Sequence, residues 1–531
     1  MTDKLWFLIP ELILFAGVVV VVVMGLSPRR SVRDALPFIT AIFLAVAFVV
    51  TPFLYTEEHV AKAGLLMPML GKFIKMIVCG VGIFLTMLTV GMIDRKYEAA
   101  LEKGKTSFDA LRVNRGEFYA FLLLSLTGVM LCCSANDLIW LFLALELTSL
   151  PTYIMVAMSR PAKKAQEAAV KYFFLGAMAS ALFLYGFALL YGSTGTIVLT
   201  EMRDAFTQQR MESGGDLNIF GTMGLILALL GVFYKIAAAP LHFYAADVYE
   251  GAAAPVTAFL AFVPKAAGMI AIMLLLGTVG WGMADGDIVG LPQPILTLLW
   301  MTAVLTMTLG NIGALLQKNV KRMLAYSSIA HSGYMLIGII AGPASGGLNA
   351  VLFYLFAYGV MNTAAFAVLT ALERKGKEVE TLDELAGLNR CHRGLTLVFA
   401  LSAASLLGFP PLLGFIGKLY LFIAGVEAGQ IVLIIIAGLN SAISACYYLA
   451  LVKAPVLDEP NARSETVTVR QPVWPKVAAL TGVLLIVAAP FFSSRVWQAT
   501  NEAVGKEMAQ LDDANQQEKP ETEIALSADR E

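Results

Sequence analysis

Four ionisable side chains interrupt long apolar stretches of this sequence. Glu146 stands in one such stretch, and Lys235, Lys265 and Lys418 stand in three later ones. If the stretches cross a membrane, each charge left alone at its centre costs about 2.5 to 3.5 kcal/mol on insertion scales. The alternative is a purely structural role, as a buried ion pair that fixes helix packing or as a lysine that snorkels to the interface. A carboxylate and three lysines at membrane depth favour the functional reading, a chain of groups that pass protons.

Lysine suits such a task because burial lowers the pKa of an ammonium from about 10.4 and a nearby carboxylate restores it. If Glu146 approaches Lys235, moving the two apart would discharge the lysine. Moving one proton against about 150 to 200 mV costs about 3.5 to 4.6 kcal/mol, and this equals about three pKa units. Making or losing one buried ion pair supplies that much.

Prolines stand close to two of the lysines. Pro240 has no N–H to bond the carbonyl of Ile236, which directly follows Lys235. The double proline at 410–411 frees carbonyls in the same way before Lys418. Free carbonyls at membrane depth are tolerated where they are buried in protein or line a hydrated cavity. We therefore expect two broken helices with water access, and the alternative is two dry kinks.

Other polar residues leave two readings open. His331 is placed to relay protons between the two lysine regions, because its ordinary pKa near 6.5 permits either charge state; otherwise it is a hydrogen-bonded packing residue. Lys171 is either an access residue for protons or an interfacial lysine that snorkels. Asp247 and Glu250 are interpreted as solvated turn residues.

The composition requires a membrane around these residues. Of 531 residues, 58% are hydrophobic and 15% are charged, and the mean hydropathy is +0.75, whereas soluble domains are about 45 to 50% apolar and about 25% charged. A net charge of −1 without a long basic block argues against a nucleic-acid partner. The five cysteines show no CxxC pair and no His/Cys cluster, so the sequence predicts no iron–sulfur or zinc site.

Apolar stretches long enough to cross a membrane recur along the chain, and each needs about 20 residues. We expect an all-α polytopic membrane protein with about fourteen transmembrane helices. The expected stretches lie at about 4–26, 35–54, 73–93, 118–133, 138–158, 168–192, 220–248, 254–278, 295–316, 323–342, 348–372, 394–424, 430–453 and 475–497.

The fourth to eighth and ninth to thirteenth stretches form two comparable five-helix units. Because five is odd, consecutive units enter the membrane from opposite sides, which predicts an inverted repeat. In each unit the fourth stretch is long and interrupted, near Lys235 and near Lys418, and matching interruptions point to a transport site. The predicted division is a three-helix segment and loop (1–117), two repeats (118–278 and 295–453), a last helix (454–500) and a polar tail (501–531).

The positions of lysine and arginine predict the orientation. Of 38 such residues, 24 fall in or at the edges of loops after odd-numbered stretches, and 10 fall in or at the edges of the N-terminus, the other loops and the tail. The positive-inside rule therefore places both termini on the non-cytoplasmic side. The tail is rich in Gln, Asp and Glu and is predicted to be disordered.

Several motifs together are specific. They are Pro10-Glu11, Leu145-Glu146 to Pro151, Phe233-Tyr234-Lys235 to Pro240, His242, Asp247 to Glu250, Pro255, Pro264-Lys265, Asn319 to His331, Met361-Asn362, Gly408 to Pro411, and Gly414 to Lys418. In these residues the sequence resembles the antiporter-like membrane subunits of proton-translocating NADH:quinone oxidoreductase, respiratory complex I, and in particular the subunit N (subunit 2) family. The likeness covers nearly all of the stretches and spares the acidic tail.

The resemblance implies a role for each buried charge. Glu146 and Lys235 would form the coupling pair, Lys265 the central proton carrier and Lys418 the exit-side lysine. It implies no cofactor in this chain, because flavin, iron–sulfur clusters and the quinone site belong to partner subunits. Expected partners are the other membrane-arm subunits, notably a neighbouring antiporter-like subunit and small membrane subunits, together with lipids, and the expected location is a bacterial inner membrane.

Two segments, 252–254 and 412–413, differ from the residues that are usual in the family that the sequence resembles. They soften hydration near the second break without removing a charge. Two alternatives stay open: a subunit of an Mrp-type cation/proton antiporter, which shares the broken-helix lysine architecture, and a purely structural spacer in the membrane arm.

Overall fold

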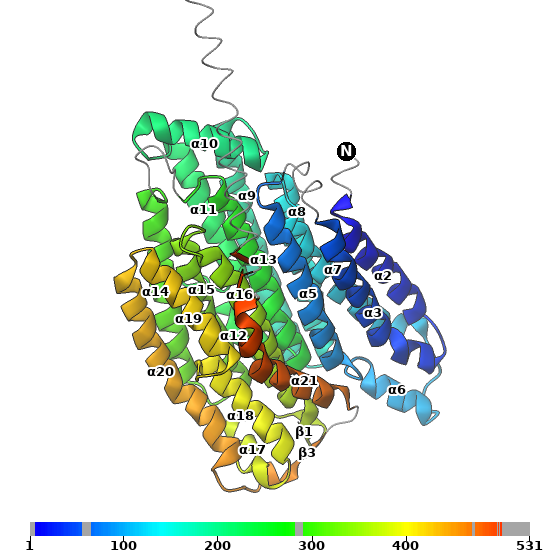
Figure 1. Cartoon of the computed structure of the whole chain (residues 1–531). Coiled ribbons are helices and arrows are strands. Elements are labelled where there is room, and N and C mark those ends of the chain that lie inside the picture. The colour runs from blue at the N-terminus through cyan, green and yellow to red at the C-terminus, as the bar shows by residue number, and fades with distance from the viewer. Residues whose placement is uncertain are drawn as a thin grey trace, which may run out of the picture.

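The protein is a bundle of long, roughly aligned helices (Figure 1). The computed structural model describes residues 6–55, 65–281, 290–469, 473–495, 497, 498, 500 and 501. In this part of the chain, 11 helices are long and apolar enough to cross a membrane. The all-α membrane fold is thereby confirmed.

Helix lies within every apolar stretch expected from the sequence. In chain order these helices are α2 (Ile9–Gly25), α3 (Arg30–Leu54), α5 (Pro68–Thr89), α7 (Arg115–Cys133), α8 (Leu138–Ser159), α9 (Lys163–Thr194), α11 (Ile219–Lys235), α12 (Tyr244–Gly251), α13 (Ala254–Gly277), α14 (Gln293–Leu315), α15 (Val320–Ala341), α16 (Gly347–Ala371), α18 (Arg393–Leu407), α19 (Leu413–Glu427), α20 (Ile431–Val456) and α21 (Trp474–Ala488). The number of crossings and the two inverted repeats stay predictions, as does the division of the chain into segments. Within the predicted tail, residues 502–531 lie outside the described residues.

Two of the expected stretches are broken where prolines stand. α11 ends at Lys235 and α12 begins at Tyr244, while α18 ends at Leu407 and α19 begins at Leu413. Proline lacks the N–H that would continue the helical ladder. Both interruptions predicted from the sequence are therefore present.

Short elements cover the ends of the bundle. They are α6 (Arg95–Glu102), α10 (Leu199–Ser213), α17 (Leu382–Leu385), four 3₁₀ turns (Ala110–Arg112, Leu388–Arg390, Ser464–Thr466 and Ala489–Phe492) and the strands β1 (Leu372–Arg374), β2 (Lys377–Glu378) and β3 (Val467–Val469). β1 pairs antiparallel with both β2 and β3. No strands were expected, because segments of two or three residues are too short to show an alternating pattern.

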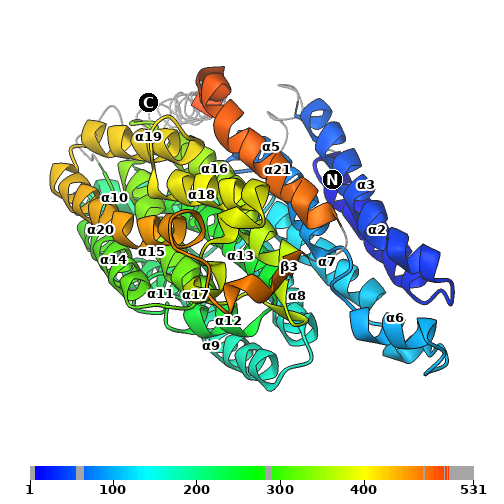
Figure 2. The same cartoon turned by 90° about the horizontal axis from the view of Figure 1, so that it is seen from below.

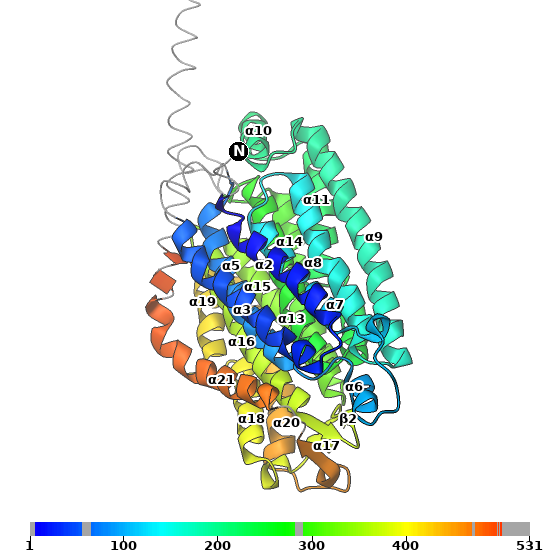
Figure 3. The same ribbon diagram turned by 90° about the vertical axis from the view of Figure 1, so that its right-hand side faces the viewer.

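The two ends of the bundle differ. α6, α17 and the three strands gather at one end, which we call the hairpin side, and α10 covers the other (Figure 3). Viewed from the hairpin side, α13 lies in the interior, while α2, α3, α9 and α20 lie at the periphery (Figure 2). Every residue of α13 is buried. The helix that carries Lys265 is thus surrounded by protein on all sides.

Candidate functional site

Glu146 and Lys235 form an ion pair between α8 and α11. The Nζ of Lys235 lies 3.2 Å from Oε1 of Glu146 and donates to Oγ of Ser149 over 2.7 Å. The hydroxyl of Ser180, on α9, donates to the same carboxylate oxygen over 2.6 Å. The lysine side chain is 3% exposed and that of Glu146 is 19% exposed. The pair expected from the sequence is therefore formed, and the Glu146 side chain is its more exposed half.

The first helix break connects this pair to Lys265. The carbonyl of Ile236, which was expected to be free, accepts a hydrogen bond from the hydroxyl of Ser332 over 2.6 Å. That hydroxyl in turn accepts from the Nζ of Lys265 over 2.8 Å. A serine on α15 thus bridges the broken end of α11 and the lysine of α13.

A cavity of about 10 Å³ lies beside this bridge, and both Lys235 and Lys265 line it. A single buried water needs about 10 to 15 Å³ of such volume and two to four polar partners. The wall also contains Tyr172, Tyr244 and Tyr249. The cavity that the two lysines line is therefore about as large as one water requires, while water access to both breaks stays a prediction.

Among the described residues, the hydrogen bonds of Lys265 run to α15, and its Nζ also lies 5.8 Å from the centre of the Tyr358 ring on α16. Besides Ser332, its Nζ donates to the carbonyl of Ser328. The hydroxyl of Ser328 accepts from Tyr358 over 2.6 Å and lies 3.3 Å from the hydroxyl of Tyr249. Among the described residues, no carboxylate lies within ion-pair distance of Lys265. Its bonds run only to neutral oxygens, so it has no partner that fixes its charge.

His331 lies between two tyrosine hydroxyls. Its Nδ1 is 2.6 Å from the hydroxyl of Tyr354 and its Nε2 is 2.8 Å from that of Tyr448. The hydroxyl of Tyr448 also bonds that of Ser327. A neutral imidazole donates from one nitrogen and accepts at the other, so the ring can take a proton on one side and release one on the other. The relay interpretation and a hydrogen-bonded packing role both fit these contacts.

Lys418 lies at the second break. Its Nζ donates to the carbonyl of Leu407 over 2.7 Å and lies 3.3 Å from the hydroxyl of Ser441 on α20. It also lies 5.0 Å from the centre of the Tyr334 ring, which is 6.0 Å from the imidazole of His331. The carbonyl expected to be freed by the double proline is thus bound by the lysine itself.

α15 is the element that brings the parts together. Ser328 and Ser332 face Lys265, His331 lies one turn on from Ser328, and Tyr334 faces Lys418. Residues three or four apart share one face of a helix. The Ser-Ser-x-x-His-Ser spacing of the motif therefore follows from its position between two lysines.

Lys171 lies apart from these buried polar residues. Its side chain is 44% exposed and pairs with Glu167 at 2.8 Å and Asp247 at 3.1 Å. Asp247 and Glu250 also pair with Arg322, at 2.7 and 2.9 Å. The interpretation of the two acids as solvated turn residues was wrong, since they attach α12 to α9 and α15. Pairings between distant segments are invisible in local sequence.

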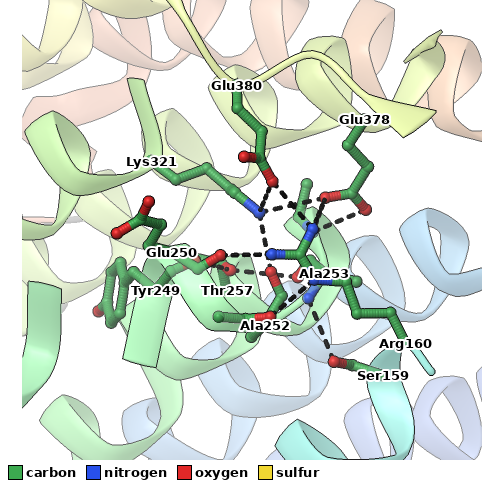
Figure 4. A network of polar contacts seen from close by, with 12 residues as sticks. Ser159, Arg160, Tyr249, Glu250, Ala252, Ala253, Thr257, Lys321, Glu378 and Glu380 are labelled. Atoms are coloured by element: carbon green, nitrogen blue, oxygen red, sulfur yellow. Dashed lines mark hydrogen bonds and ion pairs between the residues drawn. The ribbon is translucent and has the colours of Figure 1, made fainter. Parts of the chain in front are cut away.

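A further buried network was not expected from the sequence (Figure 4). The Nζ of Lys321, at the start of α15, bonds the carbonyl of Ala252 over 2.9 Å and lies 3.2 and 3.4 Å from Glu378 and Glu380. Glu378 also accepts from the backbone N–H of Ala254 at the start of α13. The hairpin formed by β1 and β2 thereby holds the first turn of the helix that carries Lys265.

Arg160 completes that network. Its guanidinium donates to the carbonyls of Glu250 and Gly251 over 2.5 and 2.7 Å and to Glu380 over 2.9 Å. Burial alone would raise the pKa of the Glu380 carboxyl, but the charges of Lys321 and Arg160 outweigh it and hold that pKa below its ordinary value. Glu380 is therefore ionised at neutral pH, and the turn between α12 and α13 is firmly anchored.

A second buried ion pair was also missed. Lys75 on α5 lies 2.7 Å from Glu11 on α2, and both side chains are at most 1% exposed. Both fall inside apolar stretches expected from the sequence, so the signal that identified the other four charges was present here too. The pair joins two helices of the N-terminal segment, whose packing it stabilises.

Comparisons with known proteins agree on one family. Residues 135–444 match the family described as NADH:quinone oxidoreductase/Mrp antiporter, TM. NADH-quinone oxidoreductase subunit N of Trichlorobacter lovleyi is 45% identical over 342 residues, which are 64% of this chain and 67% of the relative. The chain belongs to the subunit N family. The resemblance noted in the sequence is thereby confirmed.

Solved structures agree with this assignment. A chain of respiratory complex I from Thermus thermophilus is 30% identical, with a TM-score of 0.71 over 92% of this chain and 99% of that one. A chain of the Mrp complex from Dietzia has a TM-score of 0.75 over 95% of this chain and 97% of that one, at 21% identity. The latter likeness concerns the fold alone.

Proposed function

We propose that this chain is a proton-translocating, antiporter-like membrane subunit of an NADH:quinone oxidoreductase. Members of its family are subunits of that enzyme, and the assignment to a proton pathway rests on the site. The observation that carries it is that Lys235 and Lys265 line one cavity about as large as a single water requires, beside the bonds that join Lys265, Ser332 and the carbonyl of Ile236.

The three buried lysines differ in their partners, and the proposed chemistry follows from this difference. Lys235 has a carboxylate partner, and an opposite charge nearby favours the charged form of an ammonium. Lys265 and Lys418 bond neutral oxygens only, so neither has a counter-charge among the described residues that would hold it in one state. Separation of Glu146 from Lys235 favours transfer of a proton toward Lys265, and His331 then passes one toward Lys418.

The driving reaction belongs to other subunits. In this proposal flavin, iron–sulfur clusters and the quinone site lie in partner chains, and this chain holds no cofactor. It stands beside a second antiporter-like subunit and small membrane subunits. The lysine- and arginine-rich hairpin side faces the cytoplasm of a bacterial cell, so both termini lie on the non-cytoplasmic side.

The test is a Lys265→Met variant in the native complex. Inverted membrane vesicles are supplied with NADH, and proton uptake is measured together with NADH oxidation. We expect a large loss of protons moved per NADH with the complex still assembled. Unchanged pumping would mean that this chain is only a structural spacer in the membrane arm.

The Mrp-type alternative needs a separate experiment, since that complex contains the same fold. The tagged chain is purified from native membranes and its companions are identified by mass spectrometry. Recovery with NADH dehydrogenase subunits supports the proposal, and recovery with Mrp-type subunits alone rejects it.

A further inference from the structure

A large cavity opens on the hairpin side, between α6, the end of α8 and the β1–β2 hairpin. Its volume is about 1150 Å³, and seven basic and five acidic side chains line it. Nothing in the proton pathway uses this space. Its charges indicate what it can bind.

Two of the acidic residues are neutralised within the wall. Glu373 accepts from Arg95 over 2.8 Å, and Glu384 accepts from Arg374 over 2.7 Å. A third, Asp94, accepts the backbone N–H of Asn114 over 2.9 Å. These carboxylates are therefore engaged by groups of the protein.

The other two acidic residues belong to the network of Figure 4. Glu378 and Glu380 line the cavity and are held by Lys321 and Arg160. Two carboxylates pair with two cations there, so this part of the wall has no net negative charge.

Three lysines of the wall have no such partner. Lys96 lies on α6, while Lys375 and Lys377 lie on the hairpin opposite, and all three are exposed. Among the described residues none of them forms an ion pair. Like charges around one opening repel each other, so an anion placed between them would be stabilised.

The wall also has an apolar side that continues into the membrane. Leu150, Ile154 and Ala157 follow one another along the outer face of α8 and are exposed, a spacing that places them on one helix face. Ala157 and Met158 then line the cavity itself. A ligand that fits both sides needs an anionic head and an apolar body.

We propose that this cavity binds the headgroup of an anionic phospholipid. The phosphate lies among Lys96, Lys375 and Lys377, and an acyl chain follows the exposed row of α8. Basic pockets at the cytoplasmic ends of transmembrane helices are suited to such headgroups. A free phosphate would satisfy the lysines but leave the apolar row uncovered.

The experiment uses the whole purified complex. Complex stripped of lipid with detergent is incubated with nanodiscs of phosphatidylglycerol or of phosphatidylcholine, repurified, and analysed for retained phospholipid by mass spectrometry. The variant is Lys96→Gln/Lys375→Gln/Lys377→Gln. The matched control is Lys103→Gln/Lys105→Gln/Lys318→Gln, which removes equal charge from exposed lysines outside the cavity.

Wild type and control should retain phosphatidylglycerol in preference to phosphatidylcholine. The variant should lose that preference by about tenfold or more, since each lysine near a membrane surface strengthens anionic-lipid binding about fivefold. A photoactivatable acyl chain should label peptides that contain Ile154 or Met158. Equal preference in variant and wild type would overturn the proposal. So would displacement of the retained lipid by inorganic phosphate or by an acidic peptide.

Discussion

Ser332 donates its hydroxyl to the carbonyl of Ile236 over 2.6 Å and accepts from Lys265 over 2.8 Å. A hydroxyl can do both at once. The carbonyl that Pro240 leaves without a helical donor is therefore satisfied by the residue that also holds the central lysine. One hydroxyl group therefore contacts both the break that follows α11 and Lys265.

Replacing this serine tests the contact. Ser332→Ala should lower proton translocation several-fold while NADH oxidation continues, because Lys265 keeps only its bond to the carbonyl of Ser328. It should also lower stability by about 1 to 3 kcal/mol, since a buried carbonyl loses its donor. The control is Ser402→Ala, a buried serine whose hydroxyl bonds only its own helix at Val398. Equal losses of pumping in both variants would contradict the assignment.

Two variants of the Glu146–Lys235 pair distinguish its effect on stability from its effect on proton translocation. Glu146→Gln leaves a buried ammonium without its counter-ion, which should cost about 3 to 5 kcal/mol and abolish most of the pumping. The double variant Glu146→Gln/Lys235→Met should regain much of the thermal stability and none of the pumping. Thermal unfolding of the purified complex and proton uptake by vesicles measure the two. Pumping restored in the double variant would mean that the pair only supports packing.

The tyrosines around His331 provide a third prediction. Tyr354→Phe or Tyr448→Phe leaves one ring nitrogen without its partner, so the relay should slow several-fold with little change in assembly. Tyr420→Phe is the control, because that ring packs against Trp497 and Phe353 away from the imidazole. Proton uptake in all three variants is compared at equal NADH oxidation. Normal uptake in both relay variants would show that His331 is a packing residue.

Lys171 should matter far less than the buried lysines. Its pairs with Glu167 and Asp247 lie at the surface, where such pairs contribute about 0 to 1 kcal/mol. Lys171→Gln should therefore leave most proton translocation and thermal stability intact. A loss as large as that of Lys235→Met would identify it as an obligatory access residue for protons.

The network of Figure 4 predicts a dependence on pH. The pKa of Glu380 is lowered by Lys321 and Arg160 despite its burial. A lowered pKa in the folded state stabilises above the ordinary carboxyl pKa, and this contribution disappears as the pH falls through the lowered value. The stability difference between wild type and Glu380→Gln should thus be full at neutral pH and vanish in acid. A difference that grows in acid would have the wrong sign.

The helices and both breaks were predictable from sequence because their causes are local. A run of apolar residues specifies a spanning helix, and a proline removes one particular N–H. The same reasoning identified Glu146, Lys235, Lys265 and Lys418 as costly charges, and the structure places each beside polar partners within the bundle.

The partners themselves were not predictable. Lys321 meets Glu378 across 57 residues, and His331 meets Tyr448 across 117. Such contacts depend on how helices pack, which no local pattern records. Lys75 and Glu11 differ, since both lie inside apolar stretches and the cost argument applied to them as well.

The complete burial of α13 constrains how the protein is made. Helices from both halves of the chain enclose it, with α7 and α8 synthesised before it and α15 and α16 after it. A nascent chain that stops before α15 would leave Lys265 without either of its serine partners and facing lipid. The lysine segment therefore reaches its final environment only late in biogenesis, and a truncated product would be a natural substrate for membrane proteases.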